Sequence, residues 1–344
     1  MKIFVTGASG FLGKYVVAEA LRQGHQVRAV LRPMTDADRL AWASHPALEI
    51  VRLDLRQKQG LAENLSGIDA VIHLAAVKSG DFYDQFAGTV VSTENLLEAM
   101  VQADVLRLIA VSTFSVYDYL KIKPGETLNE QSPLESEPLN RDEYAQTKLI
   151  QEGLVRDFEQ MHQAPVTILR PGMIYGRECL WHAHLGAELG NRWLKIGGKA
   201  VMPMAYVENC AAAIVAALDA APAIGQTINI VDDDLPTQNT FIQALLQRSE
   251  EPQRLIPISW VGMKLLSQLA WWVRQSLLGG QARLPGILVP AKLYARFTPL
   301  QYSNAQAHKL LDWRSRYTLS QALDRSYGTQ DLLAVEVKDS TLAT

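Results

Sequence analysis

Residues 2–13 read Lys2-Ile3-Phe4-Val5-Thr6-Gly7-Ala8-Ser9-Gly10-Phe11-Leu12-Gly13, an apolar strand that runs into a glycine turn and then a helix. Gly7 permits the tight turn, Gly10 lets the backbone approach a pyrophosphate, and Gly13 lets the helix pack close to the strand. The glycines are spaced by three and three residues, unlike the commoner two-and-three fingerprint. A tight turn in any α/β protein could contain this triplet, but the flanking strand and the helical pattern at residues 12–23 favour a dinucleotide site.

Alternating strand and helix signals continue through the first half of the chain. Strands are expected at residues 2–6, 26–31, 48–53, 70–75, 106–112 and 166–170. This alternation predicts an α/β fold with a doubly wound parallel (Rossmann) sheet. Beyond Gly176 the pattern is less regular, with a strand at 227–231 and helices at 209–220 and 238–248. We expect a dinucleotide-binding domain at 1–174, a smaller, mostly helical substrate lobe at 175–327 with some strands returning to the main sheet, and a flexible tail at 328–344.

A second pattern places Tyr144 four residues before Lys148, at the start of a helical stretch that follows a Pro-rich loop. Residues at this spacing share one helix face. A nearby lysine ammonium, together with the positive nicotinamide of an oxidised cofactor, would lower the pKa of the phenol, which suits it to exchange a proton with an alcohol oxygen. A tyrosine four residues before a lysine is common by chance, but the position of Tyr144 and Lys148 about 130 residues after the glycine turn makes them candidates for a catalytic pair. Upstream, Thr113 follows the strand at 106–110, so its hydroxyl is expected at the carboxyl end of a strand, where ligands bind.

Together these motifs make the chain similar to the extended short-chain dehydrogenase/reductase superfamily. That group includes nucleotide-sugar epimerases, dihydroflavonol reductases and 3β-hydroxysteroid dehydrogenases. The resemblance covers about residues 1–325. Its motifs are Thr6 to Gly13, Asp54-Leu55, His73-Leu74-Ala75-Ala76, Ser112-Thr113, Tyr144 with Lys148, Leu169-Arg170-Pro171-Gly172, Tyr175-Gly176 and Tyr206-Val207-Glu208-Asn209.

The resemblance implies a role for each matching residue. Tyr144 would be the acid/base, Lys148 would lower its pKa and hold the ribose, and Thr113 would bind the substrate oxygen. Asp54 would face the adenine. The implied cofactor-binding residues are Gly7, Ser9, Gly10, Phe11, Leu12, Gly13, Arg32, Asp54, Leu55, Ala75, Ala76, Tyr144, Lys148 and Pro171, and the implied substrate contacts are Lys78, Thr113 and Tyr175.

The end of the second strand bears on which cofactor fits. An acidic residue there binds the ribose 2′-hydroxyl of NAD, whereas an arginine accepts the 2′-phosphate of NADP. The strand at 26–31 ends in Arg32, and no acidic residue follows until Asp36 and Asp38. A guanidinium matches a phosphate well, although Arg32 would also suit a solvated loop. We therefore predict NADP, with NAD as the alternative.

Three departures from the family pattern bear on the substrate. Thr89 stands where an asparagine usually precedes a Gly-Thr pair, and Glu208 replaces the aspartate usual before Asn209. The segment Arg170-Pro171-Gly172 lacks the Asn-Pro or Asn-Val that helps nucleotide-sugar enzymes hold a uridine diphosphate. The last departure disfavours a nucleotide-sugar epimerase.

Apolar stretches occupy residues 256–266, 269–273 and 284–290 instead. One interpretation is core or interface helices of the smaller lobe, because the pattern is amphipathic and Lys264 interrupts any membrane span. The other is an apolar lid over the substrate or a patch on a membrane, which is the less favoured of the two. Residues 285–323 resemble the tail of bacterial 3β-hydroxysteroid-dehydrogenase-like members. That branch acts on alcohols of large apolar skeletons and also includes hopanoid-associated sugar epimerases.

Composition excludes several other classes. A net charge of −3 over 344 residues, without a basic tract, argues against a nucleic-acid partner. Two cysteines are too few for a disulfide framework, and His182, His184 and Cys179 lack a carboxylate to complete a metal set, so no metal site is expected. The absence of a leader pattern leads us to expect a cytoplasmic protein, and a homodimer is expected.

The sequence thus predicts an NADP-preferring oxidoreductase that moves hydride between nicotinamide and a secondary alcohol or ketone of an apolar small molecule. An epimerase or dehydratase is the first alternative, since it would use the same hydride step transiently. A non-catalytic NADP-binding regulator is the second. Retention of Thr113, Tyr144 and Lys148 argues against the regulator, which would not need proton-transfer residues.

Overall fold

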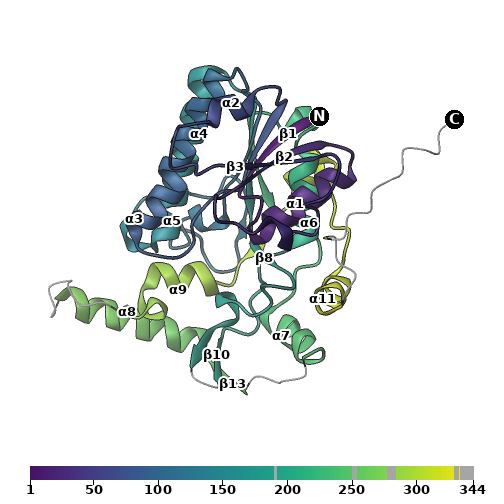
Figure 1. Ribbon diagram of the computed structural model, residues 1–344. Helices are drawn as coiled ribbons and strands as arrows, with labels where there is room; N and C mark the ends of the chain where they lie inside the picture. The colour runs from purple at the N-terminus through teal and green to yellow at the C-terminus, as the bar shows by residue number, and fades with distance from the viewer. Residues whose placement is uncertain (190–191, 250–253, 277–283, 329–332, 334–344) are drawn as a thin grey trace.

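A seven-stranded, entirely parallel sheet lies at the centre of the molecule (Figure 1), in the order β3-β2-β1-β4-β5-β7-β12. The computed structural model describes residues 1–189, 192–249, 254–276, 284–328 and 333. The strand order reverses direction between β1 and β4, so the predicted doubly wound α/β fold is confirmed. The strands are β1 (Lys2–Thr6), β2 (Gln26–Leu31), β3 (Leu48–Arg52), β4 (Ala70–His73), β5 (Leu108–Val111), β7 (Val166–Pro171) and β12 (Gln226–Ile230).

Alternating side chains of β1 show how helices cover both faces of the sheet. Ile3 and Val5 pack with one layer, and Phe4 packs with the other; all three are fully buried. Burial on both faces is what a parallel sheet requires. The first layer holds α1 (Phe11–Arg22), α6 (Val207–Ala216) and α10 (Ala305–Leu311), and the second holds α2 (Leu61–Leu65), α4 (Ser92–Gln102) and α5 (Glu143–His162). Helix α11 (Leu319–Tyr327) lies lower in Figure 1 and packs against α7 (Gln238–Leu246).

A smaller lobe lies below this sheet in Figure 1 and comes from the second half of the chain. It holds a parallel pair, β8 (Met173–Tyr175) with β11 (Met204–Tyr206), and a second sheet of β9 (Ala187–Leu189), β10 (Arg192–Ile196) and β13 (Arg254–Ile258). Its helices are α7 (Gln238–Leu246), α8 (Trp260–Ser276) and α9 (Pro290–Phe297). The chain returns to the main sheet through β12, which pairs with β7. Of the tail expected at 328–344, all but residues 328 and 333 lies outside the described residues.

Short elements complete the connections. The strand pair β6 (Thr127–Leu128) and β14 (Gln301–Tyr302) joins the loop before α5 to the C-terminal segment. A π-helical segment, η2 (Ala87–Val91), links α3 (Phe82–Phe86) to α4. The short 3₁₀ segments are η1 (Ala37–Arg39), η3 (Phe114–Val116), η4 (Pro138–Asn140), η5 (Ala183–Leu185), η6 (Ala221–Ala223) and η7 (Gly286–Leu288).

The Glu208-Asn209 pair ties α6 to the C-terminal segment. The Glu208 carboxylate accepts hydrogen bonds from Arg325 of α11 at 2.8 and 2.9 Å and from the Tyr206 hydroxyl at 2.7 Å. The Asn209 side-chain oxygen accepts from the backbone N–H groups of residues 316 and 317. Glutamate in place of the usual aspartate therefore serves a structural ion pair here.

A buried ion pair joins β7 to α5. Arg170 Nε donates to Glu152 Oε2 at 3.1 Å, its Nη2 donates to Glu152 Oε1, and its Nη1 donates to the Tyr117 hydroxyl at 3.1 Å. The Arg170 and Glu152 side chains are only 2% and 4% exposed. Burial by itself would raise the pKa of Glu152, but hydrogen bonds and charge from Arg170 lower it to about 2.

Replacing Arg170 should therefore destabilise the fold. Arg170→Met would leave the buried Glu152 carboxylate with only the partly exposed Arg156 and the Ser112 hydroxyl as partners, and we expect the free energy of unfolding in urea to fall by about 3–5 kcal/mol. Arg156→Met is the matched control, because Arg156 also contacts Glu152 at 2.8 Å but is 39% exposed. The control should lose less than about 1 kcal/mol. Because the pKa of Glu152 is lowered, the carboxylate's contribution is present at neutral pH and is lost as the pH falls toward about 2. Equal losses in the two variants would contradict this assignment.

Candidate active site

A cleft of about 770 Å³ opens at the carboxyl ends of the central strands, where the strand order reverses. Ligands of open α/β sheets bind at such a position, and the volume is that of a ligand pocket. Most of the residues predicted from the sequence line it together: Gly7, Ser9, Gly10, Phe11, Leu12, Gly13, Arg32, Asp54, Leu55, Ala75, Ala76, Lys78, Tyr144 and Lys148.

The glycine turn forms one end of this cleft. Gly7 has φ +68°, and a Cβ there would lie 2.9 Å from the backbone nitrogen of Ala75. A Cβ on Gly13 would lie only 2.0 Å from the carbonyl oxygen of Gly7, so α1 can approach the turn this closely only with glycine. Gly10 is the N-cap of α1 and supplies no side-chain cap, which leaves the first-turn amides available to an anion.

At the other end of the cleft, α5 presents Tyr144 from its first turn. The helix begins at Glu143 because the Asp142 side chain caps it, accepting from the backbone N–H of Ala145 at 2.9 Å. The Tyr144 hydroxyl forms a hydrogen bond with Thr113. Burial raises the pKa of Tyr144 to about 12, while the bond to Thr113 acts in the opposite direction. The sequence predicts a lowered pKa with the lysine ammonium and an oxidised nicotinamide both nearby; in the protein alone the pKa is raised instead, because burial penalises the phenolate more than its neighbours stabilise it.

Lys148 lies one helical turn beyond Tyr144 and is 2% exposed. Its Nζ donates to the Val111 carbonyl at 2.7 Å and to the side-chain oxygen of Gln151. Burial lowers the pKa of Lys148 to about 7; the charge of Glu152 opposes this shift and that of Lys78 adds to it. Lys78 is thus electrostatically coupled to Lys148 as well as lining the cleft.

A buried network behind Lys148 was not foreseen from the sequence. Gln151 Nε2 donates to Thr93 Oγ1 at 2.8 Å and lies 3.1 Å from His73 Nε2, whose other ring nitrogen is 2.7 Å from Thr6 Oγ1. Burial lowers the pKa of His73 to about 3, so the imidazole is neutral and structural. The sequence did contain one indication of Gln151: it follows Lys148 by three residues and therefore lies on the same face of the helix.

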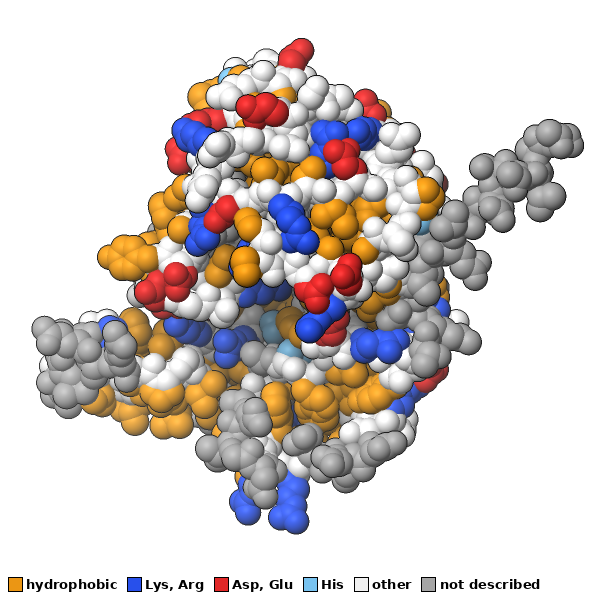
Figure 2. All heavy atoms as spheres, in the orientation of Figure 1, with side chains coloured by type: hydrophobic (Ala, Val, Ile, Leu, Met, Phe, Trp, Pro, Cys, Tyr) orange, Lys and Arg blue, Asp and Glu red, His pale blue; other side chains and the backbone are white. Residues whose placement is uncertain are grey.

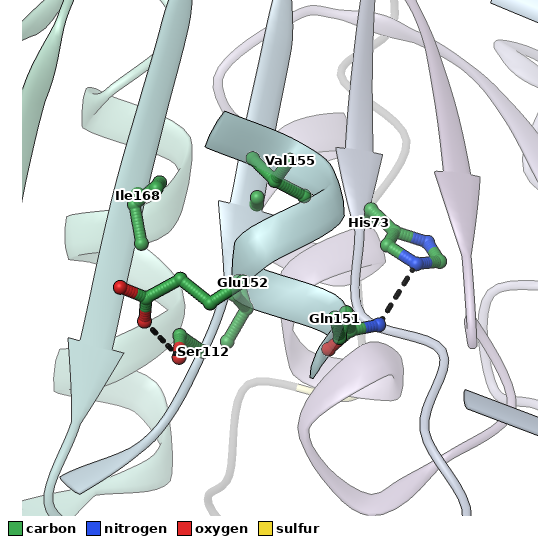
Figure 3. Close-up of a pocket in the computed structure, with 8 residues that line it drawn as sticks. His73, Ser112, Gln151, Glu152, Val155 and Ile168 are labelled. Carbon is green, nitrogen blue, oxygen red and sulfur yellow. Dashed lines mark hydrogen bonds between the residues drawn. The ribbon is translucent and has the colours of Figure 1, made fainter. Parts of the chain in front are cut away.

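Figure 3 shows α5 in front of the strands of the sheet, with Gln151 pointing to His73 and Glu152 pointing to Ser112. The small pocket between them, about 10 Å³, has room for no more than one water. Ser112 donates its hydroxyl to Glu152 at 2.6 Å. The hydroxyl of Ser112 is therefore engaged with α5, whereas that of Thr113 meets Tyr144.

Three predicted residues do not line the cleft. Tyr175 is 1% exposed and packs in the core of the lobe, its ring centroid 5.5 Å from that of Tyr206 and 5.3 Å from that of Phe241. Pro171 is buried at the end of β7, opposite Ile230 of β12. Thr113 does not line the cleft either, but its hydroxyl is hydrogen-bonded to Tyr144, which does.

Two arginines border the cleft near the carboxyl ends of β2 and β3. Arg32 is exposed at the end of β2, and Arg56 lies in the loop after β3. Arg56 Nη2 donates to Asp54 at 2.6 Å, and this hydrogen bond lowers the pKa of the Asp54 carboxyl. Arg56 was not predicted from the sequence. Among the described residues, no group of three or more His, Cys, Asp or Glu side chains is arranged to hold a metal ion.

A sequence model of the NAD dependent epimerase/dehydratase family matches residues 3–230. The chain belongs to this family and is an NAD(P)-dependent oxidoreductase of the extended short-chain dehydrogenase/reductase type, as the sequence predicts. The cleft fits a dinucleotide, since Gly7 and Gly13 let α1 approach the turn closely and the first-turn amides of α1 carry no side-chain cap.

Similar proteins act on different substrates. The 4-hydroxy-2-methyl-3-oxo-4-farnesyl-3,4-dihydroquinoline-1-oxide ketoreductase of Stigmatella aurantiaca is 26% identical, over 94% of this chain and 95% of the relative. The 3 beta-hydroxysteroid dehydrogenase/Delta 5-->4-isomerase of Mycobacterium tuberculosis is 25% identical, over 94% and 88%. The UDP-glucuronic acid 4-epimerase of Bacillus cereus, solved with NAD, has a TM-score of 0.71 at 22% identity, over 95% and 97%. At 22% identity, the similarity to this epimerase shows a shared fold and nothing about the substrate.

Gly13→Ala tests the glycine turn. Because the added Cβ would collide with the Gly7 carbonyl, we expect the free energy of unfolding to fall by roughly 1–3 kcal/mol. Displacement of the first-turn amides should also weaken dinucleotide binding by at least about tenfold. Gly153→Ala in α5 is the matched control, since its Cβ would meet no atom within 4 Å. The control should gain about 0.5–1 kcal/mol and bind normally. Unchanged binding by Gly13→Ala in calorimetric titration would contradict the assignment.

Proposed function

We propose that the protein is an NADP-preferring oxidoreductase that moves hydride between nicotinamide and the secondary alcohol or ketone carbon of an apolar substrate, of the 3β-hydroxysteroid or β-keto type. The observation that carries this proposal is the cleft, which has the glycine turn at one end and Tyr144, hydrogen-bonded to Thr113, at the other. When bound, the dinucleotide supplies or accepts the hydride. Gly7, Gly10 and Gly13 would hold its pyrophosphate, and Lys148 its ribose.

The side chains provide the proton chemistry. A raised pKa keeps the Tyr144 phenol protonated at neutral pH, the form that donates a proton to a ketone oxygen. The Thr113 hydroxyl would bind the same oxygen and fix its distance from Tyr144. Lys148, held by Val111 and Gln151, would stabilise the phenolate left after transfer. Lys78 at the rim would contact the substrate. Tyr175 is not part of this proposal, because it is buried in the lobe.

An apolar substrate is supported by the relatives. Two relatives aligned over 94% of this chain are described as a ketoreductase of a farnesylated quinoline and a hydroxysteroid dehydrogenase. The apolar stretches at residues 256–266, 269–273 and 284–290 add to this support, because they stand where nucleotide-sugar enzymes have polar and basic contacts to the diphosphate.

An epimerase or dehydratase is the second candidate, because the family includes both and an epimerase shares the fold. Turnover of UDP-sugars without net consumption of reduced cofactor would favour it. The expected homodimer and cytoplasmic location stay predictions.

Tyr144→Phe tests the proton donor. We expect turnover of apolar ketones, followed by loss of NADPH absorbance, to fall by about 10² to 10⁴-fold, because only the proton-carrying hydroxyl is removed. NADPH affinity should stay within about threefold of the wild-type value, since the ring still fills the same space. Lys148→Met should impair both turnover and NADPH binding. Substantial activity in Tyr144→Phe would remove this residue from its role.

Arg32→Asp tests the cofactor preference. If Arg32 binds the 2′-phosphate, the carboxylate would repel NADPH and accept the ribose hydroxyl of NADH, so the ratio of the two affinities should shift toward NADH by at least about tenfold. Arg39→Asp is the matched control, because Arg39 is an 86% exposed side chain outside the cleft lining. Equal losses for both cofactors in Arg32→Asp would make Arg32 a solvated loop residue.

A further inference from the structure

Helix α8 carries apolar side chains on two faces. On one face Met263 is 5% exposed, and the ring of Trp260 lies 5.4 Å from that of Tyr294 in α9, so this face forms part of the lobe's core. On the other face Val261, Leu265 and Leu269 are each 59% exposed and Trp272 is 57% exposed. Their spacing of four, four and three residues places them in one stripe along the helix. We call these four residues the α8 stripe.

The α8 stripe lies at the edge of the molecule. In Figure 1, α8 extends sideways from the lobe beneath the main domain, and Figure 2 shows a row of hydrophobic side chains along it. Scattered exposed apolar residues are normal, but a continuous stripe of large ones on a single helix indicates an interaction surface.

The charge around α8 indicates what the stripe meets. Residues 252–311 contain no Asp or Glu, although the chain as a whole has a net charge of −3. The same residues contain seven Lys or Arg: Arg254, Lys264, Arg274, Arg283, Lys292, Arg296 and Lys309. Arg274 stacks on Trp271 at 4.7 Å, at the end of α8. An apolar stripe within a basic segment that has no acidic residue is complementary to a surface with an anionic outer layer and an apolar layer beneath it.

An anionic lipid bilayer has this arrangement, and tryptophans such as Trp272 favour its interface. Across the part of the chain that the structure describes, no helix has the length and apolar character needed to span a bilayer, so α8 would lie along the surface. A second copy of the chain fits less well, because pairing two α8 stripes would bring two basic segments together.

We propose that α8 binds the protein to an anionic membrane surface, with the α8 stripe among the acyl chains and Lys264 and Arg274 at the headgroups. This position would bring the lobe to the phase in which an apolar substrate dissolves. The link to substrate rests on the function proposed above, whereas membrane binding does not require turnover and is tested separately.

Co-sedimentation of the purified full-length chain with vesicles tests the proposal. Binding to phosphatidylglycerol–phosphatidylcholine vesicles should be at least about tenfold tighter than to pure phosphatidylcholine and should weaken as salt is raised. Leu265→Asp/Leu269→Asp should bind at least about tenfold more weakly. Leu139→Asp/Met161→Asp is the matched control, since these side chains are 87% and 72% exposed on the main domain. The control should bind like the wild-type chain.

Circular dichroism and NADPH binding show whether each variant is folded. If the aspartate variant does not fold, Leu265→Gln/Leu269→Gln replaces it, with the same direction expected. Failure of the wild-type chain to bind anionic vesicles would overturn the proposal, as would equal loss of binding in the main-domain control. A dimer in sedimentation velocity that the α8 variant abolishes, without vesicle binding, would show that a second copy covers the stripe instead.

Discussion

The site depends on one row of buried polar side chains on α5. Lys148, Gln151 and Glu152 follow one another on the inner face of that helix and bond to β5, to the Thr93–His73 pair and to Arg170 of β7. Each would be costly to bury alone, since a charge or amide removed from water without partners loses several kcal/mol. Because the partners come from three different strands and from α4, they fix both the rotation of α5 about its own axis and its position along the sheet. Tyr144 therefore meets Thr113 beside the cleft.

The same row explains the electrostatics of the cleft. Burial lowers the pKa of Lys148 to about 7 and raises that of Tyr144 to about 12, so both groups are biased toward their neutral forms. The pKa of Lys148 lies near neutrality, so a bound phosphate or a neighbouring phenolate can change its protonation at small cost. Glu152 stays charged because burial is outweighed by Arg170. Lys148 and Glu152 lie on the same helix, but the ammonium is biased toward its neutral form and the carboxylate stays charged, because their partners differ.

Local sequence patterns predicted most of the fold. The strands at 2–6 and 26–31 have the predicted bounds, because each is predominantly apolar and ends at a clear signal, the glycine turn for the first and Arg32 with Pro33 for the second. The cofactor end of the cleft was predictable too, since steric demands at Gly7 and Gly13 are local. Tyr144 and Lys148 were predictable from their helical spacing.

What the sequence did not predict depends on contacts between distant segments. The pKa of Tyr144 depends on burial by the surrounding fold, and Gln151 gained its role only when β4 and α4 came beside α5. Tyr175 matched a family motif, but its ring turns into the core formed with Tyr206 and Phe241. For α8 the amphipathic pattern was visible, yet only the packing of α9 against Trp260 and Met263 shows which apolar face is left exposed.

Hydride transfer to an apolar ketone can be measured directly with NADPH deuterated at the reactive position of the nicotinamide. With a steroid-like or long-chain β-keto substrate, we predict an alcohol that carries the deuterium on its carbinol carbon and one NADPH consumed for each alcohol formed. Tyr144→Phe should leave the deuterium on the cofactor. A protein that binds NADPH but transfers no deuterium to such ketones, and interconverts UDP-sugar epimers without consuming NADPH, would contradict the proposed oxidoreductase function.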